Sequence, residues 1–321
     1  MSITLSGGLP TNFVSEFTRD VEHVCQRDKA LLENAVKTVP ISSEAKSFDT
    51  FDEMDLVAKE GRNPPTPRND VTTGRRWVES DPYHNAYQFD KDDDLQLLLD
   101  PAGETVLGLK NGRNRKVDDI ILTAFEMTVK SGRRSNSSSI TWASQNGNVK
   151  YTEASGGRTI PHDCAEGNCA AGDVGMTVEK AQLVLEYFQM NNCDMNEPIY
   201  GAVPPRVATQ LFGQEEYANV DYNDAKPLAV GRMLKSWAGI NWIQHTGITL
   251  GSSNDVDSDT DVYECWFWQP SGIILAVADS YTVSIRTRYD LSDAQEVYVH
   301  MNMGVMRRNE DKIVKVECQA G

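Results

Sequence analysis

DPAGETVLGLKNGRNRKVDDIILTAFEMTVKSG, residues 100–132, is the stretch that decides the fold of this chain. Asp100 can cap the free N–H groups of a helix, and Pro101 fits a first helical turn. Apolar side chains then recur at intervals of three and four residues, at Val117, Ile120, Ile121, Ala124, Phe125 and Thr128. The pattern predicts a helix of about 28 residues, about 42 Å long, that ends in the cations and glycine of residues 130–134. It is typical of a spine across which other elements pack, although an ordinary core helix of an α+β domain fits equally well.

The composition describes an acidic, globular chain. With 321 residues and a net charge of −16, it is long enough to bury a full core and unsuited to gripping nucleic acid through phosphates. No apolar run approaches membrane length, and the N-terminal residues resemble no signal peptide, so we expect no membrane association and a cytoplasm-like compartment. The six cysteines show no framework spacing and are expected to be free thiols: Cys25, Cys164, Cys169, Cys193, Cys265 and Cys318.

The first hundred residues predict two extensions. Apolar residues from Phe13 to Val36 recur at helical spacing and indicate an amphipathic arm of about 25 residues that ends before Pro40. The segment 43–94 indicates a long two-stranded excursion, with a proline-rich turn, GRNPPTPRNDVTTG, between its strands. Neither an isolated amphipathic helix nor an isolated two-stranded ribbon is stable in water, so both are expected to rest on other surfaces.

Residues beyond the spine predict a mixed lobe followed by strands. Residues 133–175 indicate an elaborated loop with short strands, and 177–191 a largely buried helix. GRMLKSWAGINWIQH, DVYECWFWQ and GIILAVAD are expected to be strands or short buried segments, and 281–289 a half-buried strand. The alternation from Val297 to Val305 is the cleanest in the chain, and IVKVEC is expected to pair with it as a hairpin.

No motif for catalysis or metal binding emerges. His162, Asp163, Cys164 and Cys169 form one local cluster of ligand types, but a second Cys or His pair is lacking at zinc spacing. The alternating acids Asp255, Asp257, Asp259 and Asp261 begin like a calcium loop, yet Thr260 and Trp266 stand where that loop needs Gly and Glu. We predict no enzyme, no cofactor and no metal site, with weak cation binding by the 255–261 loop as the minor alternative.

Three stretches in their order resemble the major capsid proteins of tailed phages, the Hong Kong 97-type fold. They are RRWVESDPYHNAYQFDKDDDLQLLLDP, then residues 115–121 within the spine, then GRMLKSWAGINWIQHTGI followed by RTRYDLSDAQEVYVHMNMGVMRRNEDKIVKVEC. The resemblance implies an α+β fold with five parts. These are an N-terminal arm (1–42), an extended loop called the E-loop (43–98), a peripheral domain with the spine (99–175), an axial domain (176–284) and return strands of the peripheral domain (285–321).

The resemblance also implies a function and partners. The chain would assemble with itself as hexamers and pentamers into an icosahedral shell around double-stranded DNA, without sequence-specific binding. A separate scaffolding protein, a portal and in some members a decoration protein would take part. Assembly would occur in the host cytoplasm, and the product would be the virion. An acidic chain suits this role, because it would repel packed DNA at the wall.

The E-loop supplies the candidate contacts between subunits. We hypothesise that a basic tip docks on an acidic surface of the adjacent subunit, near the acidic run at the base of the loop. The basic tip comprises Arg62, Arg68, Arg75 and Arg76, with Trp77 beside it, and the acidic run comprises Asp92, Asp93 and Asp94. A solubilising basic loop is the plainer alternative.

Other functions remain as alternatives at this stage. An encapsulin-type compartment would share the fold and enclose cargo enzymes instead of DNA. A hydrolase that uses His162 and nearby acids is a second possibility, and a decoration protein is a third, although the length and the spine argue against the latter.

Overall fold

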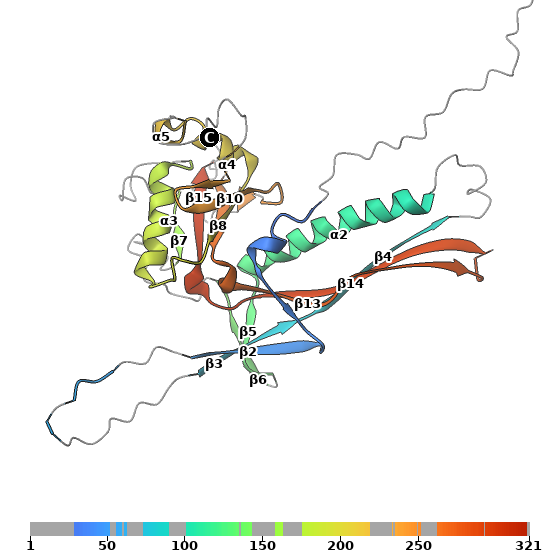
Figure 1. Cartoon of the computed structure of the whole chain (residues 1–321), viewed down its shortest axis with the longest axis horizontal. Coiled ribbons are helices and arrows are strands. Elements are labelled where there is room, and N and C mark those ends of the chain that lie inside the picture. The colour runs from blue at the N-terminus through green and yellow to red at the C-terminus, as the bar shows by residue number, and fades with distance from the viewer. Residues whose placement is uncertain are drawn as a thin grey trace, which may run out of the picture.

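The computed structural model describes residues 29–51, 56–59, 61–62, 73–89, 101–134, 136–142, 158–162, 175–218, 233, 235–248, 250–251, 262–291 and 293–319. Figure 1 shows a compact lobe at one end and a long helix and a curved sheet that reach away from it. Both chain extensions predicted from the sequence fall partly outside the described residues. The predicted α+β class is confirmed.

The first sheet has four strands and lies beneath the long helix. Its order is β1 (Lys37–Pro40), β13 (Ile273–Arg288), β14 (Ala294–Arg307) and β4 (Asp81–Phe89). β1 pairs parallel with β13, and the other two pairings are antiparallel. In β14, Val297, Met301 and Met303 are buried, as their alternation predicts.

The second sheet forms the compact lobe. Its order is β7 (Thr159–Ile160), β15 (Ile313–Gln319), β12 (Val262–Trp268), β8 (Ile199–Val203), β10 (Ile240–Gln244) and β9 (Ser236–Trp237), with β11 (Leu250–Gly251) paired to β12. The helices α3 (Val178–Met190), α4 (Pro205–Leu211) and α5 (Glu215–Ala218) belong to this lobe (Figure 1). Thr177 caps α3 by accepting a hydrogen bond from the Lys180 backbone N–H, so the helix predicted over 177–191 is confirmed.

The third sheet joins the extended loop to the body. Its antiparallel order is β2 (Ala45–Phe51), β3 (Thr73–Glu79), β5 (Val129–Arg133) and β6 (Asn136–Ile140). The two-stranded excursion predicted from the sequence is present as β2 and β3. Because β3 also pairs with β5 at Arg76 and Trp77, the base of the loop is fixed to the body.

The spine helix is α2 (Pro101–Glu126), and it ends earlier than predicted. Residues 129–133, expected to close the helix, form β5 instead, with Gly132 at a φ of +90°. Pairing with β3 and β6 outweighs the local helical pattern there. The predicted cations at the helix end therefore lie on a strand. Short 3-10 helices occupy Glu33–Ala35 (η1), Pro270–Gly272 (η2) and Glu310–Lys312 (η3).

Several other predictions need correction. Residues 29–36, expected to be part of a helix, contain only the turn η1. β15 does not form a hairpin with β14, because it pairs with β12 and β7 in the compact lobe. The strand predicted for GRMLKSWAGINWIQH, residues 231–245, contains β9 and β10, which are separated by a turn at Ala238 and Gly239 with φ angles of +52° and +72°.

β13 also differs from its prediction. The segment GIILAVAD and the strand expected at 281–289 are one continuous strand with two register shifts, between Val277 and Asp279 and between Asp279 and Thr282. Its distal half was expected to be half-buried, yet Val283, Ile285 and the following Tyr289 are exposed. The reason is that β1 pairs with β13 only up to Val277. Beyond Val277, β13 has a neighbouring strand on one side only, β14, among the described residues.

The strand pairing bears on the division into five parts. β13 begins at Ile273 and lies in the sheet under the spine helix, whereas β15 lies in the sheet of the compact lobe. β4, which the sequence assigned to the E-loop, is an edge strand beneath the spine helix. We therefore propose that the peripheral part takes in residues 273–307 and that the axial part takes in 313–319.

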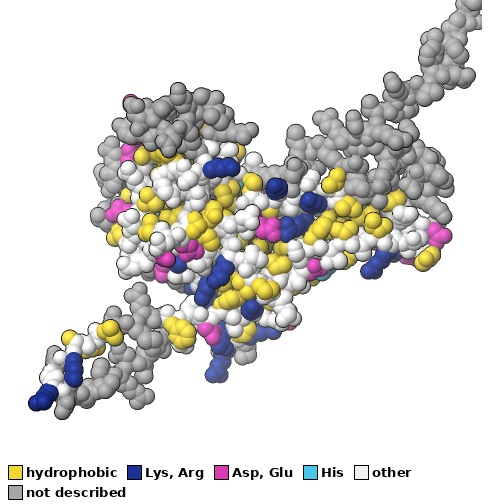
Figure 2. Space-filling model, viewed as in Figure 1, with side chains coloured by type: hydrophobic (Ala, Val, Ile, Leu, Met, Phe, Trp, Pro, Cys, Tyr) yellow, Lys and Arg dark blue, Asp and Glu magenta, His cyan; other side chains and the backbone are white. Residues whose placement is uncertain are grey.

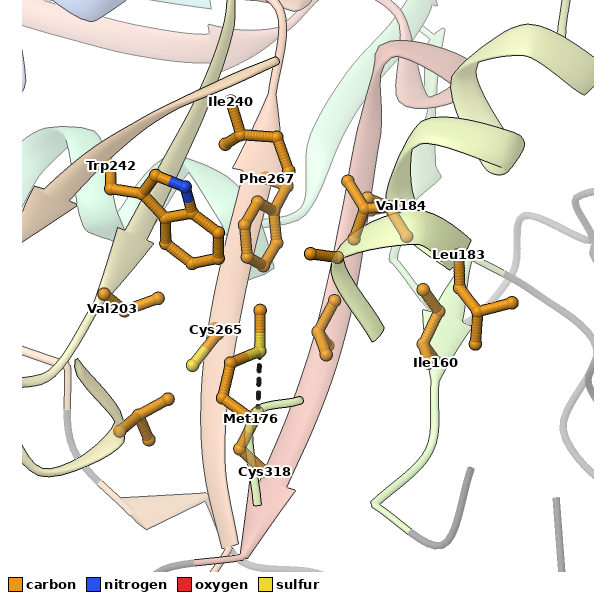
Figure 3. Close-up of a cluster of buried hydrophobic side chains, with 14 of the residues drawn as sticks. Ile160, Met176, Leu183, Val184, Val203, Ile240, Trp242, Cys265, Phe267 and Cys318 are labelled. Atoms are coloured by element: carbon orange, nitrogen blue, oxygen red, sulfur yellow. Dashed lines mark hydrogen bonds between the residues drawn. The ribbon is translucent and has the colours of Figure 1, made fainter. Parts of the chain in front are cut away.

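Three hydrophobic clusters hold these layers together. In the compact lobe, α3 packs on the second sheet, and Figure 3 shows Cys265, Cys318 and Met176 converging in this core. The Cys318 thiol lies 3.6 Å from the Met176 sulfur, and both cysteines are free. The second cluster joins the stripe of α2 to the first sheet. There Phe125 stacks on Trp266, with ring centroids 4.9 Å apart. A third, small cluster lies under the loop base.

Gly304 marks the closest approach between β14 and the crossing from β3 to β4. A Cβ placed on Gly304 would overlap the carbonyl oxygen of Glu79 and come within 3.1 Å of the Ser80 Cα. Because both obstructing groups are backbone, a side chain at this position must displace the chain where the extended loop meets the sheet.

Replacing Gly304 with alanine should therefore lower the free energy of unfolding by about 1–3 kcal/mol, as overpacking does in a close-packed core. Gly108→Ala is the matched control. Gly108 lies inside α2 with nothing within 4 Å of an added Cβ. Gly108→Ala should therefore raise the free energy of unfolding by up to about 1 kcal/mol. Urea unfolding followed by circular dichroism measures both, and a neutral Gly304→Ala would contradict the crossing geometry.

Candidate functional site

The extended loop presents apolar side chains to solvent. Leu56 is fully exposed, Val57 is 64 % exposed and Phe51, at the end of β2, is 71 % exposed. Figure 1 places the described stretch 56–59 far from the body of the molecule. No other part of the described chain covers these side chains, so a partner surface is needed to bury them.

The structure places the predicted contact residues in different surroundings. Arg62 is exposed in the outer part of the loop, whereas Arg75, Arg76 and Trp77 lie in β3, towards its base. The prediction of one basic tip is therefore corrected for the β3 residues. Arg68 and the acidic run Asp92, Asp93 and Asp94 lie outside the described residues.

Arg75 and Arg76 point to opposite faces of β3 and make different ion pairs. Arg75 donates to Asp49 across the hairpin, with Nε 2.6 Å from Oδ1, and both side chains are about half exposed. Its guanidinium lowers the pKa of Asp49. Arg76 turns inward and donates two hydrogen bonds to Glu310, at 2.6 and 2.5 Å. Trp77 Nε1 donates to the Gly132 carbonyl at 2.7 Å, which ties β3 to β5.

The Arg76–Glu310 pair belongs to a buried network at the end of the spine helix. Arg307 is fully buried and donates to the carbonyl oxygens of Ala124 and Phe125, at 3.0 and 2.8 Å. Its Nε lies 3.6 Å from Glu310. Arg307 thus supplies the positive charge that the last turn of α2 lacks in its own sequence. Burial opposes ionisation of Glu310, but the hydrogen bonds from Arg76 outweigh it and hold the pKa of this carboxyl below its ordinary value.

The junction between the spine helix and the compact lobe carries two carboxyl groups in contact. A hydrogen bond to Glu264 on β12, helped by burial, raises the pKa of Glu126 to about 7. Burial opposes ionisation of Glu264, yet the hydrogen bond from Glu126 and the charge of Lys315 lower its pKa. Lys315 Nζ lies 3.0 Å from Glu264. Near neutral pH, one proton is therefore shared across this junction, with Glu126 as the donor.

A buried His–Asp pair has a structural role. Asp118 on α2 accepts hydrogen bonds from the backbone N–H groups of Leu31 and Leu32, at 3.0 Å each, and lies 3.4 Å from His245 Nε2. His245 Nδ1 accepts from the Gly247 N–H at 2.9 Å. The pair fixes the chain at η1 to the spine helix.

Metal and membrane sites find no support in the parts of the chain that are described. His162 lies 3.9 Å from Glu317, while its proposed neighbours Asp163, Cys164 and Cys169 lie outside the described residues, as does the 255–261 loop. Within the described ranges, no three His, Cys, Asp or Glu side chains gather as metal ligands. None of the described helices is long and apolar enough to cross a membrane.

The buried network at the loop base was missed by sequence reasoning, although one signal for it exists. Alternate residues of β14 form its buried, apolar face: 297, 299, 301, 303 and 305. Arg307 is the next residue on the same face. A charged side chain on the apolar face of a strand predicts a buried group that is paired with an opposite charge. The partners Glu310 and Arg76 carry no such signal, because they are set by tertiary packing.

Comparisons with known proteins agree with this geometry. A family model described as phage capsid protein matches residues 9–320. Among solved structures, the capsid of the cyanophage Pam1 matches with a TM-score of 0.73 at 11 % identity, covering 99 % of both chains. The head of the Helicobacter pylori bacteriophage KHP40 matches with a TM-score of 0.68 at 11 % identity, covering 100 % of both chains. The capsid of the cyanophage P-SCSP1u matches with a TM-score of 0.68 at 14 % identity, covering 95 % of this chain and 92 % of that one. A search of curated protein sequences finds no match.

The two arginines of β3 should differ sharply when they are neutralised. Arg76→Gln removes the ion pair of the buried Glu310 carboxylate. It should lower the free energy of unfolding by about 3–5 kcal/mol. Arg75→Gln, on the exposed face of the same strand, is the matched control and should leave unfolding unchanged. Urea unfolding at pH 7 measures both variants. Equal losses would show that the Arg76–Glu310 pair does not anchor the loop base.

The shared proton at the junction should make stability depend on pH. The folded-state pKa of Glu126, about 7, lies above its ordinary value of 4.5. The stabilisation of the folded state by Glu126 is therefore fully present below pH 4.5 and is lost as the pH rises through 7. Glu126→Gln, which keeps the hydrogen bond without the charge, should flatten this dependence and stabilise the protein at pH 8.

Thermal unfolding of Glu126→Gln between pH 5 and 8 tests this expectation, with Glu215→Gln, an exposed substitution on α5, as the control. An unchanged pH profile in Glu126→Gln would show that the junction does not hold the proton.

Proposed function

Because the chain belongs to the phage capsid protein family, we propose that its copies assemble as hexamers and pentamers into the icosahedral head of a tailed phage around double-stranded DNA. The chain is a shell-forming major capsid protein with a Hong Kong 97-type fold. The single observation that carries this assignment is the family match over residues 9–320, which includes the extended loop, the spine helix and all three sheets. The virion is its place of function.

The extended loop is the part of the molecule that we expect to contact a neighbour. Its exposed apolar side chains cannot be buried within the described chain, and its base is fixed by Arg76 and Trp77. A rigid base with an unsupported outer part suits a segment that reaches over an adjacent subunit. We propose that Arg62, Arg68 and Arg75 face acidic surface there, whereas Arg76 serves within its own chain.

A second exposed apolar surface lies at the far end of the sheet beneath the spine helix. It comprises Val283, Ile285, Tyr289 and Leu291, next to the open edge of β13. Exposed strand edges with apolar side chains pair readily with other chains. This surface supports the proposal that the sheet, like the loop, meets other copies in the shell.

Further partners are proposed from the family role. A separate scaffolding protein, a portal and a decoration protein would act with the chain, and assembly would take place in the host cytoplasm. The net charge of −16 supports enclosing DNA without binding its sequence, because an acidic wall repels phosphate.

We propose that the chain catalyses no reaction. Its buried His245–Asp118 pair serves the backbone at residues 31 and 32. The encapsulin alternative is not favoured, because the family match is to phage capsid protein.

Electron microscopy of the purified chain, expressed alone and with a scaffolding protein, tests the proposed function. Closed shells or rings of five and six copies are expected. Dimers or other small oligomers in both preparations would contradict the proposal. The same assay on Arg62→Glu/Arg75→Gln tests the basic residues. We expect a reduced yield of shells with unchanged unfolding, because each exposed pair contributes at most about 1 kcal/mol but recurs at every contact.

A further inference from the structure

The carboxyl end of the spine helix meets two clusters of charged side chains, and each cluster is unbalanced. Towards the compact lobe, Lys315 Nζ lies 3.0 Å from Glu264 and 3.0 Å from Glu317, so one cation serves two carboxylates. Towards the loop base, three guanidinium groups meet two carboxylates among the described residues. These are Arg76, Arg158 and Arg307 with Glu310 and Asp311. Figure 2 shows basic and acidic side chains interspersed over the body of the molecule.

Arg307 has donors that the described chain does not use. Its Nη1 donates to the carbonyl oxygens of Ala124 and Phe125. Its Nε and Nη2 are buried and have no hydrogen-bond partner among the described residues. Glu310 lies 3.6 Å from Nε, but Arg76 already binds both oxygens of that carboxylate. Buried donors without partners are costly, so the Nε–Nη2 edge of Arg307 favours a further carboxylate.

Glu126 is the carboxylate that starts closest to this edge. It directly follows Phe125, whose carbonyl oxygen lies 2.8 Å from Arg307 Nη1, and it is exposed, so its side chain has room to turn. The charged groups that act on Glu126 are Glu264 on β12, Lys315 on β15 and Arg307 on β14. Because Lys315 is already shared by two carboxylates, Arg307 is the cation with donors to offer.

We propose that Glu126 exchanges between two partners, Glu264 when it is protonated and the Nε–Nη2 edge of Arg307 when it is ionised. Loss of the proton leaves two carboxylates side by side at the junction, and like charges in contact repel. Turning towards Arg307 separates the two acids and gives the three guanidinium groups a third carboxylate. It also keeps a third carboxylate away from Lys315, so the charge balance improves on both sides of the helix end.

The exchange moves a contact from one layer of the molecule to another. Glu264 belongs to the sheet of the compact lobe, whereas Arg307 belongs to the sheet beneath the spine helix. The protonated form therefore links the helix to the lobe, and the ionised form links the helix to its own sheet. Such a two-state contact is a pH-sensitive switch. All of its groups belong to one chain, so the switch goes beyond the proposed shell function and does not depend on it.

Structures of the full chain at pH 5.5 and pH 8.5, from crystals or from electron microscopy, test the exchange. A Glu126 carboxyl oxygen should lie within hydrogen-bond distance of Glu264 at pH 5.5 and of Arg307 Nε or Nη2 at pH 8.5. Glu126→Gln cannot ionise and should contact Glu264 at both pH values. If Glu126 keeps its contact with Glu264 at pH 8.5, or turns into solvent there, the exchange is wrong and the shell function is unaffected.

Arg307→Lys adds a measurement that a purely structural role of Arg307 would not move. Lysine keeps the charge at the helix end but lacks the second donor edge of a guanidinium. The midpoint of the pH dependence of thermal unfolding lies at about 7 in the unmodified chain. It should rise by about one unit in Arg307→Lys, which is a tenfold loss in the stabilisation of the ionised carboxyl. Arg75→Lys, on the exposed face of β3, is the control and should leave the midpoint unchanged. An unchanged midpoint in Arg307→Lys would contradict the exchange.

Discussion

The fully buried guanidinium of Arg307 is the constraint on which the rest of the structure depends. A charge inside a protein must be paired and hydrogen-bonded, or the fold loses several kcal/mol. Arg307 meets this requirement in part: its Nη1 donates to two carbonyl oxygens at the end of α2 and its Nε lies 3.6 Å from the carboxylate of Glu310, while Nε and Nη2 have no hydrogen-bond partner among the described residues. Glu310 in turn binds Arg76 at the base of the extended loop. One charge network therefore joins the spine helix, the last long strand and the loop.

This network explains how a long loop can have a defined direction. A two-stranded ribbon is only marginally stable in water, so β2 and β3 cannot set their own orientation. The third sheet, the Arg76–Glu310 pair and the close approach of Gly304 to Glu79 hold the root of the loop to the body. The outer part has none of these supports among the described residues and keeps Leu56 and Val57 exposed. Rigidity at the root and exposure further out suit a segment that binds a neighbouring subunit.

Local patterns predicted the elements whose neighbours lie close in the sequence. The stripe from Val117 to Phe125 and the alternation from Val297 to Val305 are buried as expected. Errors arose where distant pairing decides the outcome. Residues 129–133 continue a helical pattern but join β3, and β15 follows β14 in the chain yet crosses into the other sheet. The arginines of β3 look equivalent in sequence, and only the tertiary fold separates the exposed Arg75 from Arg76.

The two connections of the spine helix differ in a way that suits assembly. Towards the loop, opposite charges are matched in a buried network, and separating them would leave Glu310 unpaired. Towards the compact lobe, Glu126 meets a second carboxyl group, so that the contact needs a proton and weakens when both acids ionise. Of these two polar contacts, the one towards the lobe is thus the one that changes with pH near neutrality. In the shell that we propose, copies would sit in rings of five and of six, and a contact that responds to its surroundings beside a fixed loop base would let one chain suit both positions.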